Sequence, residues 1–214
     1  MSRPRWRISR GALLTALAGT LTLGCAALSK STPLEIRYFT PEAEPAEAQI
    51  SQPAAAGAPT ASLRLGRVVG GPELGEEIAW RESPMEVGFY DDSRWTERPE
   101  AYVARALDRA LFGSGRLRHV LSGPAPVLDV RVLAFEEVRA QTASSRRARV
   151  TLAVLLHDDR TVLLEQRFTH EVEVRGGKIE QLVQGLALAM HEVVEQVARQ
   201  TVATLAQQQP TTEN

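Results

Sequence analysis

The sequence predicts a fold of the α/β type (α+β), a two-layer sandwich with two helices packed on one face of an antiparallel or mixed sheet. Short segments of alternating apolar and polar residues precede and follow a first helical segment, and a longer helical segment comes last. This gives the order β-β-β-α-β-β-β-α. Hydrophobic residues make up 43% of the 214 residues, enough for a packed core. Since each helical segment has one apolar stripe, it should cover the sheet from one side.

The first element is a targeting segment at residues 1–24. Its leader, Met1–Arg10, contains four arginines and no acidic residue, and an apolar run follows at Gly11–Leu23. This run is too short for a comfortable transmembrane helix, which needs about 20 apolar residues. A basic leader before a short apolar run is typical of a secretory signal peptide.

The only cysteine, Cys25, directly follows this apolar run. The segment LTLGC at 21–25 resembles the bacterial lipobox, which implies cleavage after Gly24 and acylation of Cys25 (palmitate among the acyl chains). Such chains would anchor the protein without a spanning helix. Ala26 follows the cysteine where an aspartate would favour the inner membrane, so we expect the periplasmic face of the outer membrane. The alternative is an ordinary signal peptide, or an uncleaved anchor, with an incidental cysteine.

Residues 25–206 are expected to form one domain, followed by a polar tail at 207–214. Within this domain, residues 43–61 are rich in Ala, Pro and Glu and bury too little apolar surface to fold alone, which predicts a linker or surface loop. Extended segments are predicted on both sides of it, at Leu34–Tyr38, Ser62–Val69, Ile78–Arg81 and Met85–Tyr90.

The second half of the domain contains both predicted helices. Proline suits the first turn of the first helix, and a Gly-Ser-Gly segment at 113–115 ends it. Two hairpins are expected, one around the polar segment Gln141–Arg146 and one at the tight turn Asp158-Asp159. The predicted elements are a helix at Pro99–Phe112, strands at Val127–Phe135, Arg147–Leu156 and Val162–Val174, and a helix at Ile179–Ala206.

The charge distribution argues against nucleic acid as a partner. Residues 25–214 carry 21 basic and 26 acidic groups, whereas binding to nucleic acid needs a basic surface. The small basic cluster of Arg146, Arg147 and Arg149 is interpreted as a solvated strand edge. A single cysteine excludes an internal disulfide and a cysteine-based zinc site. No cofactor is indicated.

The sequence contains no convincing catalytic or metal-binding motif. His191 and Glu195 lie one helical turn apart in a pattern near that of zinc proteases, but the second ligand position is a glutamate and no third ligand is evident. We interpret this segment as an exposed helix face and expect no metal and no enzymatic activity. His119 and His170 fall in no catalytic motif, although a site assembled in space stays open.

The most informative segment is Trp80–Pro99, which reads WRESPMEVGFYDDSRWTERP and holds two of the three tryptophans. Large aromatic side chains in an irregular segment either plug the edge of a core or form a contact surface. Both interpretations stay open, and a contact surface would have Tyr90 and Trp95 as its main anchors. The candidate partner-binding residues are Trp80, Arg81, Ser83, Pro84, Glu86, Tyr90, Arg94 and Trp95.

These residues carry a resemblance to a known family. The strand Leu34–Phe39 shortly after Cys25, the segment Trp80–Tyr90 with its Ser-Pro-x-Glu core, the Arg-Trp pair at 94–95 and Pro99 before a helix together resemble the ABC-type transport auxiliary lipoproteins (paraquat-inducible protein C-like). The likeness covers nearly all of residues 25–206. The chain departs from the family at Trp80 and Phe39, where tyrosines are usual, and in its long Ala/Pro insertion.

The resemblance implies a non-enzymatic auxiliary or docking subunit of an ABC-type envelope lipid-transport system. Its partner would be the mammalian-cell-entry-domain substrate-binding protein of the transporter, and some family members form homo-oligomeric rings. Two alternatives from other classes stay open. One is a lipid-tethered periplasmic hydrolase that uses His119 or His170, and the other is a purely structural envelope lipoprotein.

Overall fold

The computed structural model describes residues 34–42, 60–139 and 145–208. The expected signal peptide, Cys25, nearly all of the predicted linker and most of the polar tail lie outside the described residues. The chain divides into residues 1–35 and 36–214, and the fold is that of the second unit. Its described elements are β1 (Arg37–Phe39), β2 (Ala61–Gly70), β3 (Glu77–Ser83), β4 (Glu86–Trp95), α1 (Pro99–Phe112), β5 (Leu117–His119), β6 (Val127–Arg139), β7 (Arg146–His157), β8 (Val162–Val174) and α2 (Ile179–Gln207).

The central strand of the sheet is β6. Along one edge it pairs antiparallel with β7 from end to end. Its other edge is divided: β2 pairs parallel with the first half, where Val68 lies opposite Val130, and β3 pairs parallel with the end, where Trp80 lies opposite Glu137. The described strands therefore form one mixed eight-stranded sheet, which confirms the predicted fold class.

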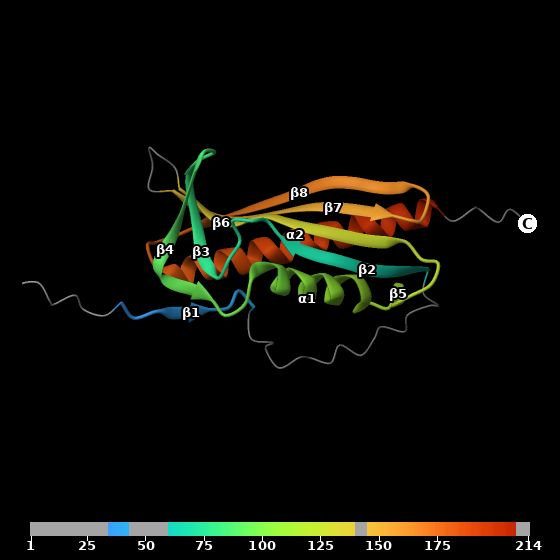
Figure 1. The fold of residues 1–214 in the computed structure, drawn as a ribbon, viewed down its shortest axis with the longest axis horizontal. Coiled ribbons are helices and arrows are strands. Elements are labelled where there is room, and N and C mark those ends of the chain that lie inside the picture. The colour runs from blue at the N-terminus through green and yellow to red at the C-terminus, as the bar shows by residue number, and fades with distance from the viewer. Residues whose placement is uncertain (1–33, 43–59, 140–144, 209–214) are drawn as a thin grey trace, which may run out of the picture. The chain divides into compact units, whose positions relative to one another are not determined.

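Hairpins join the strands on both sides of β6. As predicted, β7 and β8 pair antiparallel, and in the turn between them the backbone N–H groups of Arg160 and Thr161 donate to Asp158 Oδ1 at 2.8 and 2.7 Å. A second hairpin, β3–β4, forms the other flank, and β1 adds in parallel to the end of β4. Figure 1 shows this second hairpin projecting from the sheet.

Both helices cover the same face of the sheet (Figure 1). Tyr102 of α1 packs edge-on against Trp95, which in turn packs against Phe135 of β6. Gly185 of α2 lies so close to Ala148 of β7 that an added Cβ would be 3.0 Å from its methyl group. Phe135 and Ala148 lie on one face because Phe135 pairs with Val150, two residues from Ala148. The predicted two-layer arrangement is thus confirmed.

The apolar stripe of α2 faces the sheet, as its spacing predicted. The stripe residues are at most 5% exposed, which makes α2 the largest contributor of helical side chains to the core. They are Leu182, Leu186, Met190, Val193 and Val197.

The strand predictions were too short around β4 and missed one strand. The predicted segment Met85–Tyr90 becomes Glu86–Trp95 in the structure. Its polar end, Asp91–Arg94, lacks an apolar alternation and is held extended by pairing with β3 and with β1, where Ser93 lies opposite Arg37. The short strand β5 pairs with the start of β2 and carries too few residues for a recognisable pattern.

Candidate functional site

The β3–β4 hairpin contains most of the residues predicted to bind a partner. Its strands pair from Ala79 opposite Phe89 to Ser83 opposite Glu86, and β3 pairs in turn with the end of β6. The hairpin is thus attached to the sheet at its base, while its turn at residues 83–86 lies at the far end of the pairing. At the turn, Nη1 of Arg81 donates to the carbonyl of Pro84 at 3.2 Å. Arg81 therefore links the turn to the charged groups beneath it.

The ring of Trp80 lies flat against the opposite strand of the hairpin. A Cβ added to Gly88 would stand 2.1 Å from Cζ2 of this ring, so only glycine leaves room for the indole at that position. The guanidinium of Arg139 lies 4.3 Å from the Trp80 ring centroid, a cation–π contact. Trp80 is therefore a half-buried part of the hairpin's own packing.

A charged cluster holds the hairpin on the helix-bearing face of the sheet. Its centre is Glu137 of β6, whose side chain is fully buried. Three groups donate hydrogen bonds to this carboxylate: the Tyr90 hydroxyl, Nε of Arg139 at 3.0 Å, and Nε of Arg146. Arg146 also donates to the Tyr90 hydroxyl at 3.0 Å and to the carbonyl of Gly176 at 2.8 Å.

A second cluster lies on the opposite face, since successive strand residues point to opposite sides. Here the centre is Glu136, whose side chain is 3% exposed. Nε of Arg81 donates to its two oxygens at 3.2 and 3.1 Å, and Arg149 donates from β7. The carboxylates of the two adjacent glutamates thus tie β3, β4, β6 and β7 together. We refer to both clusters as the hairpin base: Arg81, Tyr90, Glu136, Glu137, Arg139, Arg146 and Arg149.

The hairpin base shifts the ionisation of its members. Burial alone would raise the pKa of Glu137, but the hydrogen bonds from Arg146 and Tyr90 outweigh burial and hold the pKa of this carboxyl below its ordinary value. Burial, together with the hydrogen bond to Glu137, raises the pKa of the Tyr90 hydroxyl. A charged carboxylate beside a neutral phenol is the state that the geometry favours.

The hairpin exposes apolar side chains from its turn at Met85 to Phe89, which pairs with Ala79. Met85 at the turn is 96% exposed, while Val87 and Phe89 on β4 are 37% and 41% exposed. Val87 and Phe89 lie on one face of β4, because side chains two apart in a strand share a face. Exposed apolar groups on a firmly held element are suited to contact another protein. We call Met85, Val87 and Phe89 the hairpin tip.

Two of the predicted partner-binding residues have structural positions instead. Trp95 is 1% exposed and packs edge-on against Phe135 and Tyr102, with ring centroids 5.4 and 6.3 Å away. Its placement on a contact surface was therefore wrong, and the core-plug interpretation holds for this residue. Arg94 folds back and donates to the carbonyl oxygens of Tyr90 and Ser93 at 2.6 and 3.0 Å.

The other candidates lie on or near the exposed hairpin. Pro84 and Glu86 are exposed, and Ser83, Arg81, Tyr90 and Trp80 are half-buried. Sequence reasoning missed the tip residues and the two buried glutamates. It also misjudged the basic cluster at the start of β7, because Arg146 and Arg149 form ion pairs with Glu137 and Glu136 and do not simply line a solvated edge. One signal in the sequence could have found them: two adjacent glutamates follow the apolar run of β6. Carboxylates are costly to bury without partners, so burial of this pair would have required nearby arginines.

The histidines considered for catalysis or metal binding do not gather in one place. His119 stacks on Phe112 with ring centroids 4.1 Å apart, and its Nδ1 lies 3.6 Å from Asp108. His170 lies half-buried on β8 opposite Val150. Within residues 34–42, 60–139 and 145–208, no three His, Cys, Asp or Glu side chains are grouped as metal ligands.

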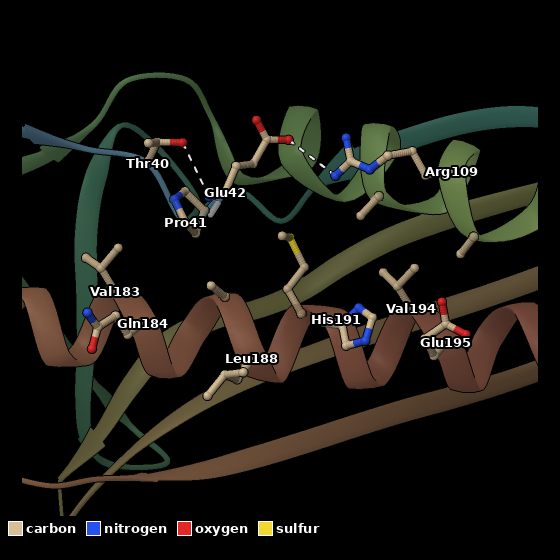
Figure 2. A pocket seen from close by; sticks show the side chains of 14 residues that line it. Thr40, Pro41, Glu42, Arg109, Val183, Gln184, Leu188, His191, Val194 and Glu195 are labelled. Atoms are coloured by element: carbon tan, nitrogen blue, oxygen red, sulfur yellow. Dashed lines mark hydrogen bonds and ion pairs between the residues drawn. The ribbon is translucent and has the colours of Figure 1, made fainter. Parts of the chain in front are cut away.

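His191 and Glu195 line a groove of about 760 Å³ between α1, α2 and residues 40–42 (Figure 2). Its floor is formed largely by alanine, valine and methionine side chains of the two helices. At its rim Glu42 accepts hydrogen bonds from Arg105 at 3.0 and 3.2 Å and lies 3.6 Å from Arg109. These hydrogen bonds lower the pKa of Glu42.

In the described part of the chain, no helix is both long and apolar enough to cross a membrane.

Comparison with known proteins identifies related sequences and folds. Residues 44–198 match the model of a family described as the ABC-type transport auxiliary lipoprotein component. The curated proteins give no match. A solved structure from Xanthomonas campestris, of the DUF330 family, is 19% identical, with a TM-score of 0.63 over 70% of this chain and 90% of that one. A hypothetical protein from Chlamydia trachomatis is 9% identical, with a TM-score of 0.50 over 69% and 98%. Because both identities are below 25%, these similarities show only that the proteins share the fold.

Proposed function

Because the chain belongs to the ABC-type transport auxiliary lipoprotein family, we propose that it is a non-enzymatic docking subunit of an ABC-type envelope lipid-transport system. Its partner in this proposal is the mammalian-cell-entry-domain substrate-binding protein of the transporter. The family match over residues 44–198 supports association with an ABC transporter. The hairpin described above supports the docking role.

The observation that carries the docking proposal is an exposed apolar tip on a firmly held base. Interfaces gain most from apolar side chains that need little ordering when the partner binds. The hairpin tip meets this condition, since the ion pairs of Glu136 and Glu137 tie its strands to the sheet at the base. Tyr90 and Trp80 act as supports of the tip in this proposal, in addition to any direct contact.

The test is binding of the purified chain to its mammalian-cell-entry partner, measured by pull-down and by biolayer interferometry. Replacing the hairpin tip with Met85→Ser, Val87→Ser and Phe89→Ser should weaken binding by at least about thirtyfold, the equivalent of about 2 kcal/mol for the loss of a single interface anchor. The matched control is Leu121→Ser, which alters another exposed apolar residue (85% exposed) outside the hairpin. Wild-type affinity in the triple variant would contradict docking through the tip.

We further propose that acylated Cys25 anchors the protein at the periplasmic face of the outer membrane. Cys25→Ser should release the protein from the membrane fraction or leave its precursor uncleaved. Intact mass spectrometry of the wild-type protein checks this directly, since a mature chain without acyl groups would contradict the lipid anchor. Density-gradient separation of the two membranes tests the outer-membrane location.

A homo-oligomeric ring is also part of the proposal. In a ring, several hairpin tips would face the partner at once and increase the apparent affinity through multivalency. Size-exclusion chromatography with multi-angle light scattering of the solubilised wild-type protein tests this proposal. A monomer at micromolar concentration would contradict the ring and leave the docking test by single-site affinity unaffected.

A further inference from the structure

A hollow of about 740 Å³ lies on the sheet face opposite the helices. It is lined by residues of β2, β6, β7 and β8, at the opposite half of β6 from the hairpin base. Three arginines from three different strands line it: Arg67, Arg131 and Arg167. A hollow of this size is within the range of pockets that bind small molecules, about 300–1,000 Å³.

The pairing of the strands explains how two of these arginines come together. Ala153 of β7 lies opposite Arg131 on one side and opposite Arg167 on the other. Neighbouring strands are about 4.8 Å apart, so the two arginine backbones are separated by about 10 Å. The methyl group of Ala153 fills little of the space between them. Two long side chains can therefore approach the same ligand from opposite sides.

Arg67 approaches from the irregular stretch of β2, where the register shifts between Leu65 and Val68. Its backbone N–H donates to Oδ1 of Asp129 at 2.7 Å. The other oxygen of Asp129 lies 3.3 Å from Nε2 of His157. Asp129 is thus already engaged, and its contact with Arg67 involves the backbone.

The three arginines differ from the other arginines on this face. Arg81 and Arg149 form ion pairs with Glu136, and Arg147 forms one with Glu171. Arg67, Arg131 and Arg167 are exposed, and within the described residues their side chains make no ion pair or hydrogen bond. The other acidic residue in the lining is Glu165, exposed on the outermost strand β8. The hollow therefore has three guanidinium groups available for an anion.

The hollow also has an apolar part, which comes from Val69, Leu133 and Leu155. Guanidinium groups bind oxyanions through paired hydrogen bonds, and three of them match the three free oxygens of a phosphate monoester better than a carboxylate. We propose that this hollow binds an alkyl phosphate, with the phosphate held by Arg67, Arg131 and Arg167 and the alkyl group lying on the apolar residues. The inference is independent of the docking proposal.

The test uses isothermal titration of the full chain carrying Cys25→Ser, which removes the expected acylation site and leaves every described residue intact. The probes are octyl phosphate below its micelle-forming concentration, inorganic phosphate, octanoate and octyltrimethylammonium. Octyl phosphate should bind most tightly, and its affinity should fall as salt is added. Inorganic phosphate and octanoate should bind more weakly, and octyltrimethylammonium should not bind.

The variant pair Arg131→Gln with Arg167→Gln should weaken octyl phosphate binding by at least about tenfold, the loss expected for charge-assisted hydrogen bonds. Arg199→Gln, an exposed arginine on α2, is the matched control and should change the affinity by less than about twofold. Equal binding of the cationic probe by the wild-type chain would overturn the proposal, as would equal binding of inorganic phosphate. So would wild-type affinity in the double variant.

Discussion

The two halves of β6 are held in the sheet by different kinds of interaction. In the first half, Leu128, Val130 and Val132 are at most 2% exposed and lie in the apolar core under the helices. In the second half, Glu136 and Glu137 are equally buried but each is surrounded by arginines. The first half pairs with β2 and the second with β3, which belongs to the projecting hairpin.

The two types of interaction suit different roles: apolar burial stabilises the first half of β6, whereas ion pairs in the second half orient the hairpin. Apolar burial is non-directional and stabilises the sheet without setting the angle of a particular side chain. Hydrogen-bonded ion pairs have defined geometry, and a buried carboxylate without its partners is costly. The hairpin therefore has one orientation in which both glutamates are satisfied. That restriction suits an element that presents an exposed tip.

The largest effect is expected at the boundary between the two halves, where Trp95 packs on Phe135. Trp95→Ala should lower the free energy of unfolding by about 3–5 kcal/mol, the usual cost of removing a buried large aromatic side chain. Chemical denaturation monitored by far-UV circular dichroism measures this change. A loss below about 1 kcal/mol would mean that Trp95 does not plug the core.

A comparable effect, without any change to a charged residue, is expected for Leu186→Ala in α2. Leu186 is fully buried, so the substitution should cost about 2–5 kcal/mol in unfolding free energy. Binding to the partner should stay near wild type at temperatures where the variant is folded, because the hairpin base is untouched. A change in stability below about 0.5 kcal/mol, typical of surface sites, would place Leu186 outside the core.

A smaller effect with a characteristic pH dependence is expected for Glu137→Gln. At neutral pH it should cost about 1–3 kcal/mol, since the charge-assisted hydrogen bonds are weakened while the shape is kept. The pKa of Glu137 in the folded chain lies below its ordinary value of 4.5. Its contribution to stability is thus present above that value and is lost as the pH falls through the folded pKa.

Urea denaturation between pH 7 and pH 3 checks this contribution. The variant should lose less stability on acidification than the wild type, while Glu42, Asp158 and Glu180, whose pKa values are also lowered, should keep part of the dependence. Glu165→Gln, which changes an exposed carboxylate, is the control and should follow the wild-type curve. Identical acid sensitivity in Glu137→Gln and the wild type would contradict the role of the hairpin base.

The smallest effect on stability is expected at the hairpin tip. Met85→Ser should change the free energy of unfolding by less than about 0.5 kcal/mol, because Met85 is 96% exposed. Val87→Ser and Phe89→Ser should each cost about 1 kcal/mol, because these residues are only 37% and 41% exposed. Thermal unfolding of the triple variant, the same protein that is used in the binding experiment, measures the change in stability. A large drop in the unfolding temperature would show that the tip stabilises the fold and would weaken its assignment as a docking surface.

Local patterns were enough to predict both helices, β7, β8 and their hairpin, and β6 as far as Phe135, although β6 continues to Arg139. In the two helices and in β7, most apolar residues of the pattern are buried against one continuous core, so periodicity and burial coincide. The same reasoning also selected the segment from Trp80 to Pro99 as the informative one. It could not decide which aromatic side chains of that segment were buried, because Trp95 and Phe89 lie on the same strand with opposite exposure.

By itself the sequence determined the fold class, the order of most elements and the family, because each is carried by local patterns or short motifs; acylation of Cys25 stays a prediction. Only the tertiary structure decided the division of β6 between β2 and β3, the burial of Trp95 and the partners of Glu136 and Glu137. The physical reason is distance along the chain. Arg81 and Arg149 meet on Glu136 although 68 residues separate them in numbering, and no local pattern encodes which strand brings a charge to its partner.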